Sequence, residues 1–132
     1  MKRQTLILTI TKNLNLLRVL RNRYQVMKLD SEAKDLNENK LDRLLKMVLP
    51  DLIIVDVDAP LTKNLRLSLQ IRNKLDVPLL MISSGADNVR RVDFSKSSGI
   101  GDPIDEKGIL AQIEKIFSRN RAAERLVTSQ AG

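Results

Sequence analysis

The chain of 132 residues contains neither cysteine nor histidine. The absence of cysteine excludes disulfides, a thiolate nucleophile and any cysteine-based metal site. The absence of histidine excludes an imidazole base, a histidine-ligated metal and a Ser-His-Asp triad within this chain. Aromatic residues are also scarce, with one Tyr, two Phe and no Trp, so a stacking platform for single-stranded nucleic acid is not expected. With no glycine-rich phosphate loop either, we predict no enzymatic activity.

Long hydrophobic runs are missing too. No stretch approaches the roughly 18 apolar residues that a membrane-spanning helix requires, so we expect no membrane partner and a cytoplasmic location. The N-terminus has a basic start and a short apolar run, but Lys12 and Asn13 soon break that run. It also lacks a small-residue cleavage site, which favours a first β-strand over a signal peptide.

Negative charge is absent from the first part of the chain. Residues 1–29 contain seven Lys and Arg and no Asp or Glu, within a chain of net charge +7 and pI about 10. A basic surface of this kind suits DNA, RNA or an acidic protein surface. It is equally consistent with an ordinary solvated surface, and both readings stay open.

The most informative segment that is present runs from Pro50 to Pro60. Leu52, Ile53, Ile54 and Val55 are consecutive and apolar, which is typical of a strand buried on both faces in a parallel sheet. Two aspartates, Asp56 and Asp58, follow this run. Open α/β sheets place their sites at the carboxyl ends of such strands. The segment therefore predicts a buried central strand that delivers an acid to a crevice.

Strand and helix patterns alternate along the rest of the chain, which predicts βαβ units and an α/β fold with a parallel sheet. We expect one folded domain over residues 1–118 and a C-terminal helix extension or linker over residues 119–132. The expected strands cover residues 6–10, 24–29, 52–57, 79–82 and 98–101. The expected helices cover residues 14–23, 41–48, 65–75 and 86–94, with a last helix capped by Asp105.

Five such units, the Pro50–Pro60 segment and the sequence Asp-Pro-Ile-Asp at 102–105 together resemble the receiver domain of bacterial response regulators, over roughly residues 4–118. The resemblance implies a flavodoxin-like (CheY-like) three-layer α/β/α sandwich. Its five-stranded parallel sheet would have the order 2-1-3-4-5. It also implies a part in two-component phosphorelay signal transduction, with a signalling protein or an output domain as partner.

Two positions match the chemistry of that family. Asp56 corresponds to the aspartate that accepts the phosphoryl group, and Ser83 corresponds to the Ser or Thr that contacts it. The expected pocket departs from the family elsewhere. The paired acids that hold Mg²⁺ at the end of the first strand are replaced by Thr9, Ile10 and Thr11.

The fifth strand departs as well. The family's lysine before proline is here Asp102, in the step Asp102-Pro103, and its aromatic switch residue is here Gly99. Mg²⁺ is usually held by several oxygen ligands that include carboxylates. Asp56 and Asp58 remain for that purpose, and Lys12 could instead bring a fixed positive charge to the pocket.

We therefore predict an atypical receiver domain, or pseudo-receiver, that regulates or binds other proteins without Mg²⁺-dependent phosphorylation and without a cofactor. One alternative is a phosphorylatable receiver in which Asp56, Asp58 and waters hold Mg²⁺. Another is a regulator that binds nucleic acid through its basic face, directly or through an output domain. A homodimer is also expected, because receivers often pair through their last strand and helices.

Overall fold

The computed structural model describes residues 5–29, 38–56, 76–84, 89–92 and 100–131. The expected helix over residues 65–75 lies outside them. Six strands form one sheet: β1 (Leu6–Ile10), β2 (Gln25–Lys28), β3 (Leu52–Asp56), β4 (Leu79–Ser83), β5 (Val89–Val92) and β6 (Ile100–Ile104). The described helices are α1 (Leu14–Arg21), α2 (Glu38–Val48) and α4 (Glu106–Ala131).

The strand order is β2-β1-β3-β4-β5-β6. Strands β1 to β4 pair in parallel, so the expected α/β class and the order 2-1-3-4 are confirmed. The expectation of five strands, all parallel, is wrong. Strand β5 is an additional strand, antiparallel to both of its neighbours, β4 and β6.

The additional strand lies where the sequence predicts a helix over residues 86–94. Val89 and Val92 are three positions apart, a spacing that also fits one face of a helix. Pairing with β4 and β6 supplies hydrogen bonds that local periodicity does not reveal, and β-branched valines fit a pleated surface. Strand β6 also extends past the expected end, through Pro103. Proline is tolerated there because β6 lies at an edge of the sheet.

The core has two parts, one on each face of the sheet. On the first face, helices α1 and α4 pack through Leu16, Leu20, Ile109, Ile113 and Phe117 against Ile7, Leu52, Ile54, Leu80 and Ile82. On the second face, α2 packs through Leu41 and Leu45 against Leu8, Ile10, Ile53 and Val55. Consecutive residues of β3 alternate between the two clusters, as a strand with side-chain period two must. This arrangement gives the three layers that the sequence predicts.

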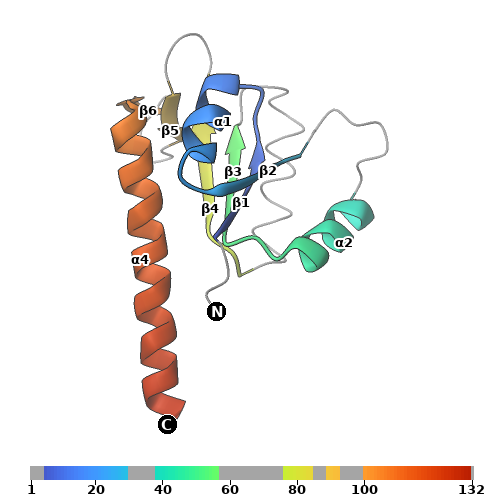
Figure 1. Cartoon of the computed structure of the whole chain (residues 1–132), viewed down its shortest axis with the longest axis vertical. Helices are drawn as coiled ribbons and strands as arrows, with labels where there is room; N and C mark the ends of the chain where they lie inside the picture. The colour runs from blue at the N-terminus through green and yellow to red at the C-terminus, as the bar shows by residue number, and fades with distance from the viewer. Residues whose placement is uncertain (1–4, 30–37, 57–75, 85–88, 93–99, 132) are drawn as a thin grey trace.

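Helix α4 begins at the expected cap, because the Asp105 Oδ1 accepts a hydrogen bond from the Gly108 N–H at 2.7 Å. Its first turns pack on the sheet, and the helix then continues past the lower edge of the sheet to Ala131 (Figure 1). Tyr24 joins it to the turn after α1: the hydroxyl donates to Glu114 Oε1, and the ring meets Phe117 edge-on at 5.6 Å.

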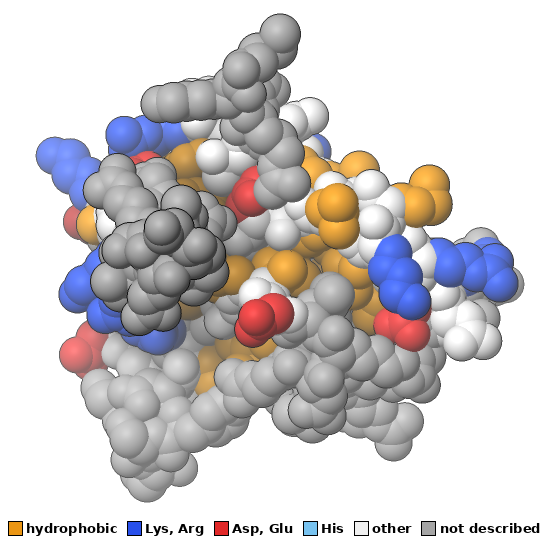
Figure 2. Space-filling view, turned by 90° about the horizontal axis from the view of Figure 1, so that it is seen from below, with side chains coloured by type: hydrophobic (Ala, Val, Ile, Leu, Met, Phe, Trp, Pro, Cys, Tyr) orange, Lys and Arg blue, Asp and Glu red, His pale blue; other side chains and the backbone are white. Residues whose placement is uncertain are grey.

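Positive charge is not confined to one part of the surface. Seen from below, Lys and Arg side chains lie on two sides of the molecule, with hydrophobic side chains between them (Figure 2). Within the described residues, no helix combines the length and the apolar character needed to span a membrane. Net charge alone therefore does not single out a binding surface.

Candidate functional site

Asp56 ends β3 at the carboxyl edge of the sheet, as the sequence predicts. The alternation along β3 places its side chain on the face of Leu52 and Ile54, which α1 and α4 cover. The carboxylate is almost completely enclosed, with 3% of the residue exposed. A buried carboxylate is stable only when hydrogen bonds replace the water that it has lost.

Two neighbouring strands supply hydrogen bonds to Asp56. From the residue after β1, the Thr11 hydroxyl donates to Oδ2 at 2.8 Å. From the residue after β4, the Ser84 hydroxyl also donates to Oδ2, and the Ser84 backbone N–H donates to Oδ1 at 3.3 Å. The carboxylate therefore connects the ends of three adjacent strands, β1, β3 and β4, in one polar cluster.

Thr11 also connects this cluster to helix α1. Its hydroxyl oxygen accepts a hydrogen bond from the Asn13 backbone N–H at 3.1 Å. Asn13 is the N-cap of α1, and its Oδ1 accepts from the Leu16 N–H at 3.0 Å. Asparagine is a favoured N-cap because its side chain satisfies a free backbone donor of the first turn. The start of α1 is thus fixed to the residue that holds Asp56.

Of the other residues expected near the pocket, some are buried in the sheet and one is exposed. Ser83 is buried, with 6% exposed, and its Cα pairs with that of Arg90 on β5. Ile10 belongs to the core on the α2 side. Thr9 is fully buried, and its hydroxyl has no hydrogen-bond partner among the described residues. Lys12 is exposed at the end of β1, and Asp58 lies outside the described residues.

Asp102 and Pro103 are not brought to Asp56. They lie on β6, three strands from β3, because β4 and β5 stand between them. At about 4.8 Å per strand, that separation amounts to roughly 14 Å. Both residues are exposed. The Asp102 carboxylate therefore lies at the edge of the sheet and not beside the Asp56 carboxylate.

Strand β5 instead brings two arginines beside β4. The Cα of Asp56 pairs with that of Ile82, and Ile82 pairs in turn with Arg91, which is exposed. Arg90 lies in the next row and donates from its Nη1 to the Gly101 carbonyl at 3.5 Å. The sequence did not predict this placement, because a helix was expected over residues 86–94. Only a strand at these positions aligns the two arginines with the end of β3.

Ser84 is the other residue that the sequence did not identify. The resemblance singles out Ser83, yet the hydroxyl that contacts Asp56 belongs to its neighbour. The sequence does contain a signal, the pair Ser83-Ser84 at the end of β4 and directly after it. Because adjacent residues of an extended chain point to opposite faces, one serine of such a pair faces the Asp56 side chain. Among the described residues, no group of three acidic side chains lies close enough to hold a metal ion.

Comparison with known proteins supports the fold. No protein-family model matches the chain, and no curated protein matches it. Among solved structures, the chain is similar to the N-terminal domain of the nisin resistance regulator NsrR, a lantibiotic response regulator. The TM-score is 0.60 at 19% sequence identity, and the match covers 86% of this chain and 98% of that one. The protein therefore has a receiver-like fold, in agreement with the resemblance in its sequence.

Proposed function

We propose that this protein is an atypical receiver domain that acts as a regulatory, protein-interaction module in two-component signalling and does not depend on Mg²⁺-driven phosphorylation. It would act in the cytoplasm, on a signalling partner or an output domain, and not as an enzyme. The observation that carries the proposal is the state of Asp56. Its carboxylate is 3% exposed and accepts hydrogen bonds from Thr11 and Ser84.

The proposal follows from what phosphorylation of Asp56 would require. A carboxylate oxygen has to leave its internal donors and meet a phosphoryl donor whose negative charge is neutralised. In the receiver family Mg²⁺ supplies that neutralisation, held partly by acids at the end of the first strand. Here Thr9 and Thr11 occupy that end of β1, and neutral hydroxyls bind Mg²⁺ more weakly than carboxylates do. Internal hydrogen bonds would thus take the place of the metal and the phosphoryl group.

Incubation with acetyl phosphate and Mg²⁺, followed by intact-mass measurement, tests this proposal. We expect no phosphoryl adduct on the wild-type protein, and the same mass for Asp56→Asn treated in parallel. A stoichiometric adduct that disappears in Asp56→Asn would overturn the proposal. An adduct that persists in Asp56→Asn would show modification elsewhere and would leave the assignment for Asp56 intact.

A phosphoacceptor role for Asp56 is the second candidate, and one observation favours it. The row Asp56–Ile82–Arg91 places an exposed arginine two strands from the carboxylate, and its guanidinium group would supply the positive charge in place of the metal. Under this alternative, phosphorylation would occur without Mg²⁺ and would decrease in Arg91→Ala. The acetyl phosphate experiment, repeated with EDTA and with this variant, separates the two candidates.

A further inference from the structure

A groove of about 570 Å³ opens beside the turn between α1 and β2. It lies at the amino edge of the sheet, because Thr5 precedes β1 and Gln25 begins β2. Asp56 lies at the carboxyl edge, about 16 Å away by the length of a five-residue strand. The groove is therefore separate from the polar cluster around Asp56. It is lined by Thr5, Arg21, Asn22, Arg23, Tyr24 and Gln25.

The charged side chains that line this groove are all positive. Both of its arginines, Arg21 and Arg23, are exposed, and the guanidinium group of neither takes part in a hydrogen bond or ion pair within the described part of the chain. The segment from Asn13 to Lys28 carries four Lys and Arg and no acid. Both cations of the groove are arginines, whose planar forks bind carboxylates and phosphates with two parallel hydrogen bonds. The groove thus favours an anionic ligand.

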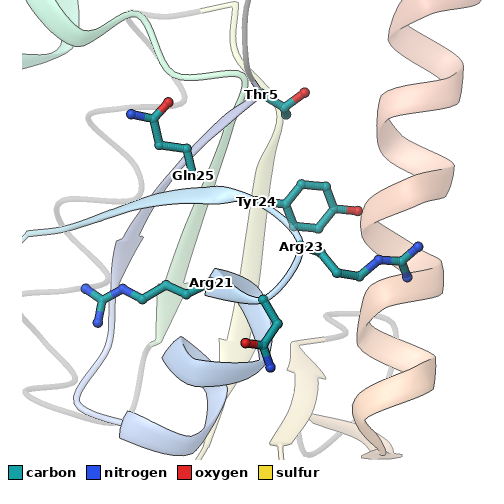
Figure 3. Close-up of a pocket in the computed structure, with 6 residues that line it drawn as sticks. Thr5, Arg21, Arg23, Tyr24 and Gln25 are labelled. Atoms are coloured by element: carbon teal, nitrogen blue, oxygen red, sulfur yellow. The ribbon is translucent and has the colours of Figure 1, made fainter.

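The directions of the side chains indicate an extended ligand. Arg21 and Arg23 leave the turn in different directions, and Tyr24 is directed toward α4 (Figure 3). A single small anion does not reach two guanidinium groups that diverge, whereas a chain with several carboxylates along its length meets both. The neutral lining residues Asn22 and Gln25 carry amides that can bond the backbone of such a chain.

A peptide also fits the shape better than a nucleic acid duplex does. The surface is concave, and its volume is within the range of about 300–1,000 Å³ that is typical of ligand pockets. A duplex is a thick convex rod, which would contact the tips of the arginines and leave the groove empty. Single-stranded nucleic acid would need aromatic platforms, and the groove's one ring, Tyr24, already packs on Phe117.

We infer that the groove at the α1–β2 turn binds an acidic, extended segment of a partner protein, with carboxylates paired to Arg21 and Arg23. The inference rests on the proposed function, because it assigns the partner-binding surface of an interaction module. The two can fail separately. Incubation with acetyl phosphate tests the phosphorylation of Asp56 at the carboxyl edge of the sheet. Peptide titration tests binding in the groove at the amino edge.

Tyr24 provides a direct measurement. It is the chain's one tyrosine, there is no tryptophan, and Tyr24 lines the groove, so intrinsic fluorescence reports on this place alone. We would titrate the full chain with an oligoglutamate peptide and, in parallel, with oligoglutamine of the same length. A saturable change in Tyr24 emission is expected with oligoglutamate only. The association constant should fall as salt is added, because exposed charges are screened.

Charge-reversal variants give the matched comparison. Arg21→Glu and Arg23→Glu should each lower the association constant about tenfold, which corresponds to roughly 1.4 kcal/mol, because each change removes one charged partner of the peptide. Arg43→Glu carries the same change of charge on α2, on the opposite face of the sheet, and should stay within about twofold of the wild type. Circular dichroism checks that each variant is folded.

Four results would overturn the inference. No emission change with oligoglutamate would show that the groove does not bind acidic chains. An equal loss in Arg43→Glu would show attraction by net charge alone. A saturable change with inorganic phosphate would indicate a small-anion site instead. Tighter binding of a DNA duplex, with the same dependence on Arg21 and Arg23, would assign the surface to nucleic acid.

Discussion

Replacing Thr11 by valine removes the hydroxyl that holds both Asp56 and the start of α1, while it nearly preserves the shape of the side chain. The hydrogen bond to the Asp56 carboxylate, at 2.8 Å in a buried setting, is of the kind that contributes about 1.5–3 kcal/mol. The bond from the Asn13 N–H, at 3.1 Å, adds roughly 0.5–1.5 kcal/mol. We therefore expect Thr11→Val to lower the free energy of unfolding by about 2–4 kcal/mol.

Urea denaturation measures this loss. With a slope of about 2 kcal/mol per molar urea, the middle of the usual range, the midpoint should fall by roughly 1–2 M at unchanged slope. Thr11→Ser is the matched control, since it keeps the hydroxyl and removes one methyl group. Its expected cost is about 0.8 kcal/mol, the contribution of one buried methyl or methylene group.

A double-mutant cycle with Asp56→Asn then assigns the loss to the pair. If the Thr11 hydroxyl acts through the carboxylate, its removal should cost less once Asp56 is asparagine, with a coupling of about 0.5–3 kcal/mol. The reasoning is refuted if Thr11→Val lies within about 0.5 kcal/mol of the wild type. It is also refuted if Thr11→Ser loses as much as Thr11→Val, because the hydroxyl would then contribute nothing.

Three further predictions concern the scaffold. Ile54→Ala should cost about 2–5 kcal/mol in urea denaturation, since Ile54 is fully buried against α1 and α4, and a cost below about 1 kcal/mol would contradict that packing. Asn13→Ala should cost about 1 kcal/mol through the lost N-cap of α1, while Asn13→Ser should restore most of it; equal losses would argue against capping. Tyr24→Phe keeps the ring contact with Phe117 and removes the donor to Glu114, so hydrogen exchange should become faster in the first half of α4 and stay unchanged in β3. Unchanged exchange in α4 would show that this hydrogen bond does not hold the helix.

The buried strands of the fold could be predicted from the sequence because their pattern is local. The consecutive apolar residues of β3 and β4 are typical of strands in a parallel sheet that is covered on both faces. The stripe at Ile109, Ile113 and Phe117 likewise fixes the packed face of α4. Strand β5 could not be predicted in the same way. Its hydrogen bonds connect it to β4 and β6, and the three-residue spacing of Val89 and Val92 also fits one face of a helical turn.

The candidate site was predictable in part for the same reason. Asp56 follows directly from its place at the end of β3, and Thr11 follows from the end of the neighbouring strand. The positions of Asp102 and Arg91 in the sheet depend on whether one or two strands follow β4. Because a helix was expected over residues 86–94, the predicted positions of both residues were wrong. The choice between Ser83 and Ser84 depends on which of two adjacent side chains faces the carboxylate, and the family resemblance pointed to the other one.

The central claim is that internal hydrogen bonds occupy the Asp56 carboxylate in place of a metal and a phosphoryl group. Nuclear magnetic resonance of the ¹⁵N-labelled protein, titrated with beryllofluoride and Mg²⁺, tests it most directly, because this anion mimics the phosphorylated aspartate. We predict no saturable shift of the Asp56, Ser83 and Ser84 amide signals in the wild type, and the same result in Asp56→Asn. Saturable shifts of these signals that vanish in Asp56→Asn would contradict the account.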